Sequence, residues 1–209
     1  MINQIVNKIR KTNSVFELVI VTKNQDIDRI YKIYNSGELN FAENKVQEII
    51  SKRKKLPQNI KWHMIGHLQT NKVKLIAPFI HMIQSVDSVK ILKQINKYAE
   101  KNKRKINCLI QVKVSGDLNK YGFSVKDFDL LMKSDYKNDF PFVNIKGLMC
   151  ISSLTSDEQK IRKEFKLLKK LSLKIDTNSP IVSMGMSNDY QIALQEGSNM
   201  IRLGTIIFS

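Results

Sequence analysis

The chain of 209 residues is long enough for one α/β domain, and its 42% hydrophobic and 26% charged residues, with 8 glycines and 4 prolines, exclude collagen-like and low-complexity sequences. No apolar run approaches the roughly 20 residues that cross a bilayer, and the first residues lack the apolar region of a signal peptide, so we expect a soluble, cytoplasmic protein. The 35 basic and 19 acidic residues give a formal net charge of +16, which raises the question of a nucleic-acid partner.

Short apolar runs typical of buried strands alternate with longer helical patterns along the whole chain, and no linker interrupts them. After a predicted helix over residues 2–11, the predicted strands cover residues 18–21, 39–41, 61–65, 80–83, 107–114, 144–150, 181–183 and 200–203. The helices predicted between them cover residues 27–34, 45–54, 71–76, the segment after Asp87, and residues 125–132, 157–173 and 189–195.

Eight strand–helix units without a linker predict a single domain over residues 1–209, folded as a (β/α)₈ TIM barrel. Parallel strands need crossover connections and are buried on both faces, which matches the continuous apolar runs. A doubly wound sheet is the alternative. That fold usually has a glycine-rich turn after its first strand, whereas residues 22–25 are Thr-Lys-Asn-Gln.

The basic residues follow a pattern that favours a solvated surface over a nucleic-acid site. The densest clusters lie in residues 52–55 and 101–105, where helical patterns end and cations complement the helix dipole. No basic run alternates with aromatic residues, and no helix-turn-helix, zinc-finger or RNA-binding motif is present. We therefore expect no nucleic-acid partner and no membrane partner, and we keep nucleic-acid binding as an alternative that a steep salt dependence would reveal.

Functional residues of such a barrel lie at the carboxyl ends of its strands. Lys23 directly follows the first predicted strand, and an amine withdrawn from water at the rim of the barrel is a candidate nucleophile toward an aldehyde. A lysine at a strand end also commonly extends into solvent. Both readings of Lys23 remain open from the sequence.

The loops after the seventh and eighth strands are the usual phosphate site of this architecture. Residues 184–189 form a glycine-containing turn that opens a helix, with Ser187 or Asn188 as its N-cap, and free N–H groups there favour an anion. Gly204 offers a second close backbone approach and Thr205 a hydroxyl. An ordinary capped turn is the alternative.

Arg202 lies in the last predicted strand and points to the face opposite Ile201 and Leu203. A guanidinium inside a barrel requires an acceptor. A pyridine nitrogen would serve, because a permanent cation beside it keeps the ring unprotonated. The structural alternative is a salt bridge to Glu43 or Asp87.

Other notable side chains favour structural roles. Cys108 and Cys150 fall inside predicted strands, so we expect buried free thiols. His63 and His67 are four residues apart in a strand and its loop, without a third ligand, so we expect no metal site. Trp62 alternates with His63, so one of the two faces the barrel interior. Met184 and Met186 most simply pack in the core, and the alternative is that they contact a ligand ring.

Six ordered segments together resemble the pyridoxal phosphate homeostasis protein family, which is itself similar to the barrel half of alanine racemase. The segments are residues 19–23, 41–48, 62–72, 146–149, 183–189 and 201–205. The resemblance covers nearly the whole chain. It implies an alanine-racemase N-terminal-domain-like barrel that binds pyridoxal 5′-phosphate.

The resemblance also implies roles for individual residues. Lys23 would form a Schiff base with the cofactor aldehyde, and Arg202 would face the pyridine nitrogen. The phosphate would be held by Ser187, Gly204 and Thr205, and the ring pocket would be lined by Asn44, Ile65 and Gly66. The family is understood as a carrier or regulator of vitamin B6 without an established catalytic reaction. Apo-enzymes that use the cofactor are the candidate recipients, and we expect a monomer or a weak dimer.

A racemase-like enzyme that uses pyridoxal phosphate is the alternative function. An alanine racemase would need a second domain that brings a tyrosine base to the opposite face of the cofactor, and 209 residues leave no room for one. Because the tyrosine base would be missing, we expect no catalytic residue. A separate departure from the resemblance is His67, which stands where we would expect a small residue or a proline.

Overall fold

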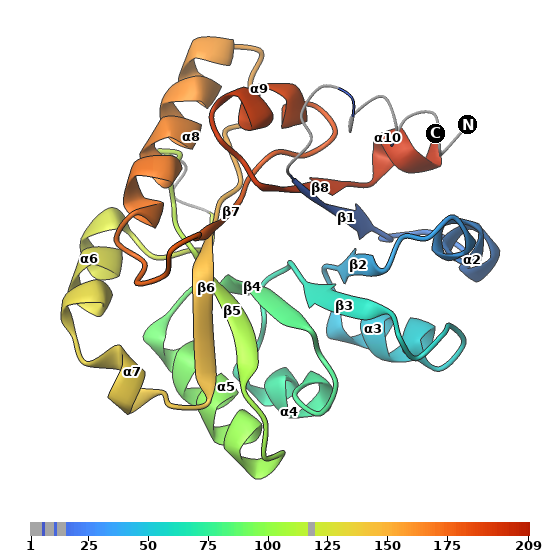
Figure 1. Ribbon diagram of the computed structural model, residues 1–209, viewed down its shortest axis with the longest axis horizontal. Helices are drawn as coiled ribbons and strands as arrows, with labels where there is room; N and C mark the ends of the chain where they lie inside the picture. Colours follow the sequence, from blue (N-terminus) through green and yellow to red (C-terminus); the bar gives the residue numbers. More distant parts are fainter. Residues whose placement is uncertain (1–5, 7–10, 12–15, 117–119) are drawn as a thin grey trace.

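The structure, a computed structural model, describes Val6, Lys11 and residues 16–116 and 120–209. Within these residues, eight parallel strands close into a barrel (Figure 1). The strands are β1 (Glu17–Val21), β2 (Asn40–Glu43), β3 (Lys61–Met64), β4 (Met82–Val86), β5 (Ile106–Gln111), β6 (Val143–Met149), β7 (Ile181–Ser183) and β8 (Met200–Leu203). The predicted (β/α)₈ barrel is confirmed.

The helices lie around the outside of the ring of strands (Figure 1). They are α2 (Ile27–Asn35), α3 (Val46–Arg53), the 3₁₀ turn η1 (Thr70–Lys72), α4 (Val73–Ile76), α5 (Val89–Lys101), α6 (Val125–Lys133), α7 (Tyr136–Asp139), α8 (Glu158–Ser172), α9 (Tyr190–Gln195) and α10 (Thr205–Phe208). The predicted helices from residue 27 onward are found, whereas α7 and α10 were not predicted. Most of the helix predicted over residues 2–11 lies outside the described residues.

Strand β4 shows why the predicted strand bounds differ from the observed ones. The apolar run predicted a strand over residues 80–83, but β4 begins at Met82 and continues through Gln84 to Val86. Gln84 and Ser85 are fully buried. The predicted strand therefore ended too early, at a polar residue that in fact lies inside the barrel. Because barrel strands alternate between interior and exterior, polarity by itself does not indicate where such a strand stops.

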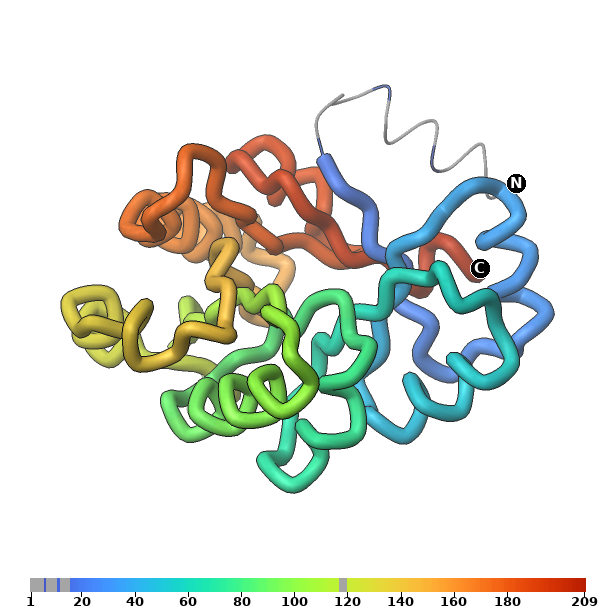
Figure 2. Tube along the Cα trace, turned by 60° about the horizontal axis from the view of Figure 1, so that its bottom comes forward, coloured from blue at the N-terminus to red at the C-terminus, as the bar shows by residue number. Residues whose placement is uncertain are grey.

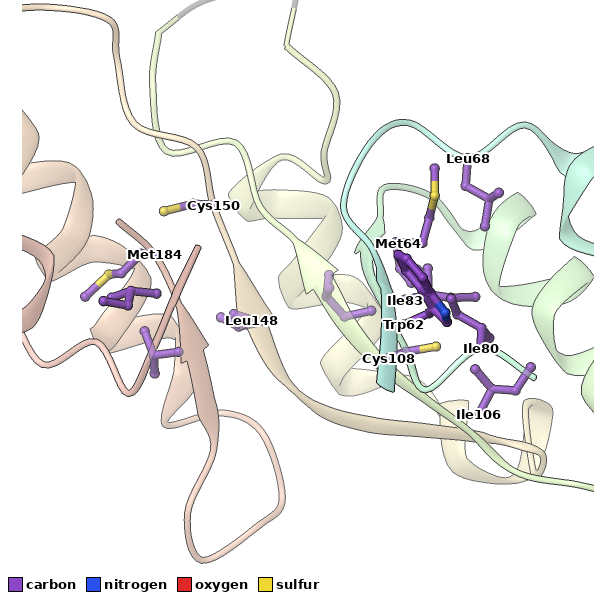
Figure 3. Packing of buried hydrophobic residues seen from close by; sticks show 14 of the residues in the cluster. Trp62, Met64, Leu68, Ile80, Ile83, Ile106, Cys108, Leu148, Cys150 and Met184 are labelled. Carbon is purple, nitrogen blue, oxygen red and sulfur yellow. The ribbon is translucent and has the colours of Figure 1, made fainter. Parts of the chain in front are cut away.

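Alternation along the strands creates two separate apolar layers. One lies between strands and helices, where Trp62 packs among Ile80, Ile83 and Cys108 (Figure 3). The other fills the barrel, and its buried members are Val19, Ala42, Met82, Leu109, Met149 and Met200. Trp62 belongs to the outer layer, and its neighbour His63 bonds to the interior residue Gln84, which settles the alternation that the sequence left open.

The two cysteines are buried free thiols, as the sequence predicted, and the structure places them in the outer layer. Cys108 and Cys150 are both free and fully buried. Burial raises the pKa of the Cys150 thiol to about 12. The thiolate, which is the reactive form of cysteine, is therefore suppressed at both positions, because burial raises the pKa of Cys108 as well.

The barrel closes by pairing the first strand with the last. Ile20 of β1 is in register with Leu203 of β8, so the two strands end at the same rim of the barrel. The end of the chain then packs against α2, where the Arg29 guanidinium donates to the Phe208 carbonyl and lies 5.4 Å from the centre of its ring. Figure 2 shows this meeting of the red end of the tube with the blue segment near its start.

A close approach of β6 to β7 yields a first prediction. A Cβ atom at Gly147 would lie 1.9 Å from the Ile181 carbonyl oxygen, so Gly147→Ala forces these strands apart. We expect it to lower the free energy of unfolding by roughly 1–3 kcal/mol, as overpacking does. Urea denaturation measures this, with Gly116→Ala as control, because nothing lies within 4 Å of a Cβ at Gly116. Equal midpoints for the two variants would contradict the observed packing.

Candidate functional site

A cavity of about 420 Å³ opens at the carboxyl ends of β6, β7, β8 and β1. Four of the eight predicted site residues line it, namely Ser187, Arg202, Gly204 and Thr205. A larger groove, of about 770 Å³, lies between α5 and α6 and contains no predicted site residue. We take the smaller cavity as the candidate site because polar side chains from several strand ends meet there.

Lys23 lies in a turn directly after β1, at the same rim as the cavity. The Gln25 N–H donates to the Thr22 carbonyl at 3.0 Å, and Asn24 adopts a left-handed conformation with φ of 59°. Asparagine tolerates this region better than most residues. Lys23 itself is exposed and does not line the cavity, so of the two readings that the sequence left open, the structure favours the lysine that extends into solvent.

The turn that carries Lys23 is anchored by a buried ion pair. The Lys52 ammonium lies 2.5 Å from a Glu43 carboxylate oxygen and donates to the Thr22 carbonyl at 2.8 Å. The Thr22 hydroxyl donates to the same Glu43 oxygen at 2.6 Å. Lys52 is 5% exposed, so the prediction that residues 52–55 form a solvated basic cluster is wrong at this position. The cluster fixes the backbone immediately before Lys23.

Asn44, Ile65 and Gly66 lie together at the ends of β2 and β3 and do not line the cavity. A Cβ atom at Gly66 would lie 2.2 Å from the Asn44 carbonyl oxygen, so only glycine permits this approach. Ile65 packs against the interior layer, and its N–H donates to the Glu43 carbonyl at 3.0 Å. These residues therefore form a separate part of the same barrel mouth.

Two loops bring backbone N–H groups to the cavity. The N–H groups of Ser187, Asn188, Gly204 and Thr205 make no hydrogen bond to another described residue. The Ser187 hydroxyl accepts from the Ile206 N–H at 3.4 Å. Gly204 is pressed against β1, where a Cβ atom would lie 3.1 Å from the Val21 carbonyl oxygen. Unpaired N–H groups beside two hydroxyls suit a bound anion.

Asp189 holds the first of these loops in place. One carboxylate oxygen accepts from the Met186 N–H at 2.6 Å, and the other accepts from the Ser152 hydroxyl at 2.5 Å. Asp189 is also the N-cap of α9, which corrects the prediction of Ser187 or Asn188 in that role. The side chains of Ser187 and Asn188 are thereby free to face the cavity.

Arg202 is buried at the inner wall of the cavity, with 3% of its surface exposed. Its guanidinium donates to the Ser183 hydroxyl at 2.6 Å and to the Cys150 carbonyl at 2.8 Å. Burial lowers the pKa of this guanidinium, although arginine remains a cation in proteins. A planar guanidinium has five N–H donors, so further donors remain for a ligand.

Neither carboxylate that the sequence offered as a partner of Arg202 contacts it. Glu43 pairs with Lys52, and Asp87 accepts from His67 at 2.6 Å. The His67 ring also stacks on Tyr121, with 3.8 Å between ring centres. The charge of Arg202 is therefore balanced by a hydroxyl and a carbonyl dipole rather than by a direct ion pair.

Sequence reasoning missed several residues that line the cavity. Lys120 donates to the Ser152 carbonyl at 2.7 Å, and Ile151 contributes an apolar wall. Lys120 follows no apolar run or motif, so no local signal pointed to it. The two methionines have different environments. Met184 is fully buried in the outer layer, whereas Met186 is 38% exposed and lines the cavity.

The described part of the chain lacks two further features, a metal site and a membrane-spanning helix. No three side chains of the His, Cys, Asp and Glu types come together in a way that could hold a metal ion. No helix among these residues combines the length and the apolar character that a membrane span requires.

Comparisons with known proteins agree with this architecture. The family model of the alanine racemase N-terminal domain matches residues 2–209. An alanine racemase from Streptomyces coelicolor has a TM-score of 0.79 at 11% identity, over 99% of this chain and 57% of that one, which is a likeness of fold alone. The fold and the position of the cavity thus define a barrel of the alanine racemase N-terminal type.

More similar relatives specify the family. The pyridoxal phosphate homeostasis protein of Helicobacter pylori is 34% identical over 215 residues, covering 99% of this chain and 96% of that protein. The protein of the same name from Schizosaccharomyces pombe is 34% identical over 91% of this chain and 82% of its own length. PipY of Synechococcus elongatus superimposes along both whole chains at 28% identity, with TM-scores of 0.91 without and 0.89 with bound pyridoxal phosphate. The chain belongs to the pyridoxal phosphate homeostasis protein family.

The buried ion pair behind Lys23 yields a second prediction. Lys52→Met leaves the Glu43 carboxylate buried without its cation, which we expect to lower the free energy of unfolding by about 3 kcal/mol. Urea denaturation measures the loss. Lys54→Met, at an exposed lysine two residues further on, should change stability by less than about 0.5 kcal/mol. A Lys52→Met variant as stable as Lys54→Met would rule out the anchoring role.

Proposed function

We propose that residues 1–209 form one domain that holds pyridoxal 5′-phosphate at the described cavity, as a non-catalytic carrier or regulator of vitamin B6. One observation carries the proposal. The pairing of β1 with β8 sets the Lys23 turn beside the loop of Gly204 and Thr205. An amine and an anion-binding surface at one rim are what a small phosphorylated aldehyde requires at its two ends.

The described residues fit the phosphate and the ring of this cofactor. The unpaired N–H groups of Ser187, Gly204 and Thr205, with two side-chain hydroxyls, would hold the phosphate. Arg202 would donate one of its remaining N–H groups to the ring nitrogen. Asn44, Ile65 and Gly66 would border the ring from the opposite part of the mouth.

The covalent partner in this proposal is Lys23. When bound, the cofactor supplies an aldehyde that condenses with an amine and a ring that withdraws electrons. Lys23 lies two residues after Val21, and Val21 lines the cavity. The flexible four-carbon side chain of Lys23 can turn from solvent toward the cavity. The cation of Arg202 would keep the ring nitrogen unprotonated, which weakens the electron sink and favours storage over catalysis.

The proposal extends to partners and location. Apo-enzymes that require pyridoxal phosphate would receive it from this protein, which would act in the cytoplasm as a monomer or weak dimer. The exposure of Lys23 supports transfer, because an amine in contact with solvent is accessible to a competing amine or to water. A carrier needs such reversible access to its cargo.

Absorbance tests the proposed role of Lys23 directly. Purified protein mixed with pyridoxal phosphate should develop a band near the edge of the visible range, and Lys23→Ala should abolish it. Lys45→Ala, at another exposed lysine near the barrel mouth, is the matched control and should keep the band. Borohydride reduction followed by peptide mass mapping should place the cofactor on Lys23. A band that survives Lys23→Ala, or a label on another lysine, would overturn the assignment.

Equilibrium dialysis tests the proposed phosphate contacts. Thr205→Val and Ser187→Ala each remove one hydroxyl, and a hydrogen bond to a charged group is worth about 1.5–3 kcal/mol, so retention of the cofactor should fall roughly 10- to 100-fold. The absorption band should persist at saturating cofactor because the backbone donors remain. Thr177→Val, at an exposed threonine outside the cavity, should leave retention unchanged. Unaltered retention in both site variants would refute these contacts.

A further inference from the structure

A chain of buried hydrogen bonds crosses the barrel interior from Arg202 to β2. Arg202 donates to the Ser183 hydroxyl at 2.6 Å, and Ser183 donates to the side-chain oxygen of Gln84 at 2.7 Å. The Gln84 amide lies 2.9 Å from Nδ1 of His63, and Nε2 of His63 lies 3.3 Å from the Asn40 side-chain oxygen. Ser183, Gln84 and His63 are fully buried. Side chains from β8, β7, β4, β3 and β2 are thus connected in series.

The direction of every bond in this chain follows from Arg202. A guanidinium can only donate, so the Ser183 oxygen accepts from it and the single Ser183 proton goes to Gln84. The side-chain oxygen of Gln84 is thereby occupied, and its amide nitrogen must donate to His63. Nδ1 of His63 is then an acceptor, which places the imidazole proton on Nε2, toward Asn40. A cation at one end therefore selects one neutral tautomer at the other.

The surroundings of His63 support the neutral form. Burial, with smaller contributions from His81 and Lys61, lowers the pKa of His63 to about 3. The His81 ring centre lies 5.2 Å from that of His63. Gln84 also donates to the Met200 sulfur at 3.3 Å, which fixes the amide further. Among the described residues, no carboxylate hydrogen-bonds to Arg202, Ser183, Gln84 or His63, so no anion here favours an imidazolium.

We propose that Ser183, Gln84 and neutral His63 are positioning residues that hold the Arg202 guanidinium in the orientation needed to meet the ring nitrogen of the cofactor. This inference rests on the proposed function. The Ser183 hydroxyl and the Cys150 carbonyl each accept a hydrogen bond from a different terminal nitrogen of the guanidinium, which fixes both nitrogens. The Ser183 oxygen is itself fixed because its proton is committed to Gln84. The relay thereby prevents rotation of a long side chain that has no direct ion pair.

The empty protein gives the first test. Nitrogen chemical shifts of the three histidines separate protonated from unprotonated ring nitrogens, and the signals of His63 are those that vanish in His63→Gln. In the wild type we expect a proton on Nε2 and none on Nδ1 between about pH 5 and 8. Gln84→Glu replaces the donor with an acceptor and should put a proton on Nδ1. A wild-type proton on Nδ1, or no change in Gln84→Glu, would overturn the relay.

The loaded protein gives the second test. Ser183→Ala removes the link between Arg202 and Gln84, so release of pyridoxal phosphate should accelerate about tenfold, and the absorption band should become sensitive to pH as the ring nitrogen gains access to a proton. Ser183→Thr keeps the hydroxyl and should restore both properties. Gln84→Met, of similar shape, breaks the next link and should behave like Ser183→Ala, which provides a second variant if Ser183→Ala does not fold.

The outcomes separate this inference from the proposed function. A wild-type protein without a Lys23-dependent band overturns the proposed function, and the positioning role falls with it, while the nitrogen shifts still decide whether the relay exists. A wild type with the band, together with folded Ser183→Ala and Gln84→Met variants that release the cofactor at the wild-type rate and keep its spectrum, overturns the positioning role alone. Near-ultraviolet circular dichroism verifies that the variants are folded.

Discussion

Pairing of the first strand with the last is the constraint on which the rest of this structure depends. Four register pairs join β1 to β8, from Glu17 with Met200 to Ile20 with Leu203. Residues almost a whole chain apart thereby share one rim. Without that closure, the Lys23 turn and the loop of Gly204 and Thr205 would lie at opposite edges of an open sheet. The candidate site is thus a consequence of closure rather than of any single loop.

Two buried cations near this rim are stabilised in different ways. Lys52 is paired with the Glu43 carboxylate, which offsets most of the cost of removing a charge from water. Arg202 has only a hydroxyl and a carbonyl as direct partners. A weakly hydrated guanidinium tolerates such an environment better than an ammonium does. The paired cation supports the backbone, and the cation without a direct counter-ion keeps donors available at the cavity.

The sequence predicted the barrel, and half of the site residues that it predicted line the cavity. It failed where a residue acts through distant partners. The apolar runs gave all eight strands within about three residues at each end, but buried Gln84 made β4 appear to end early. Lys52 resembled its neighbours in residues 53–55, and only the packing of α3 on β2, with Glu43 and the Thr22 carbonyl as partners, buries it. Lys120 reached the cavity from a loop that carries no motif.

The sequence alone determined the order of strands and helices, the barrel class, and the presence of an amine, two glycine-containing turns and an arginine at strand ends. Periodicity and turn chemistry are local properties, so they are readable without a partner. The tertiary structure decided that His63 rather than Trp62 faces inward, that Arg202 bonds to Ser183 rather than to a carboxylate, and that Lys23 is exposed. These outcomes depend on which side chains meet across the barrel, and such contacts are set by strand register and closure over long separations in the chain.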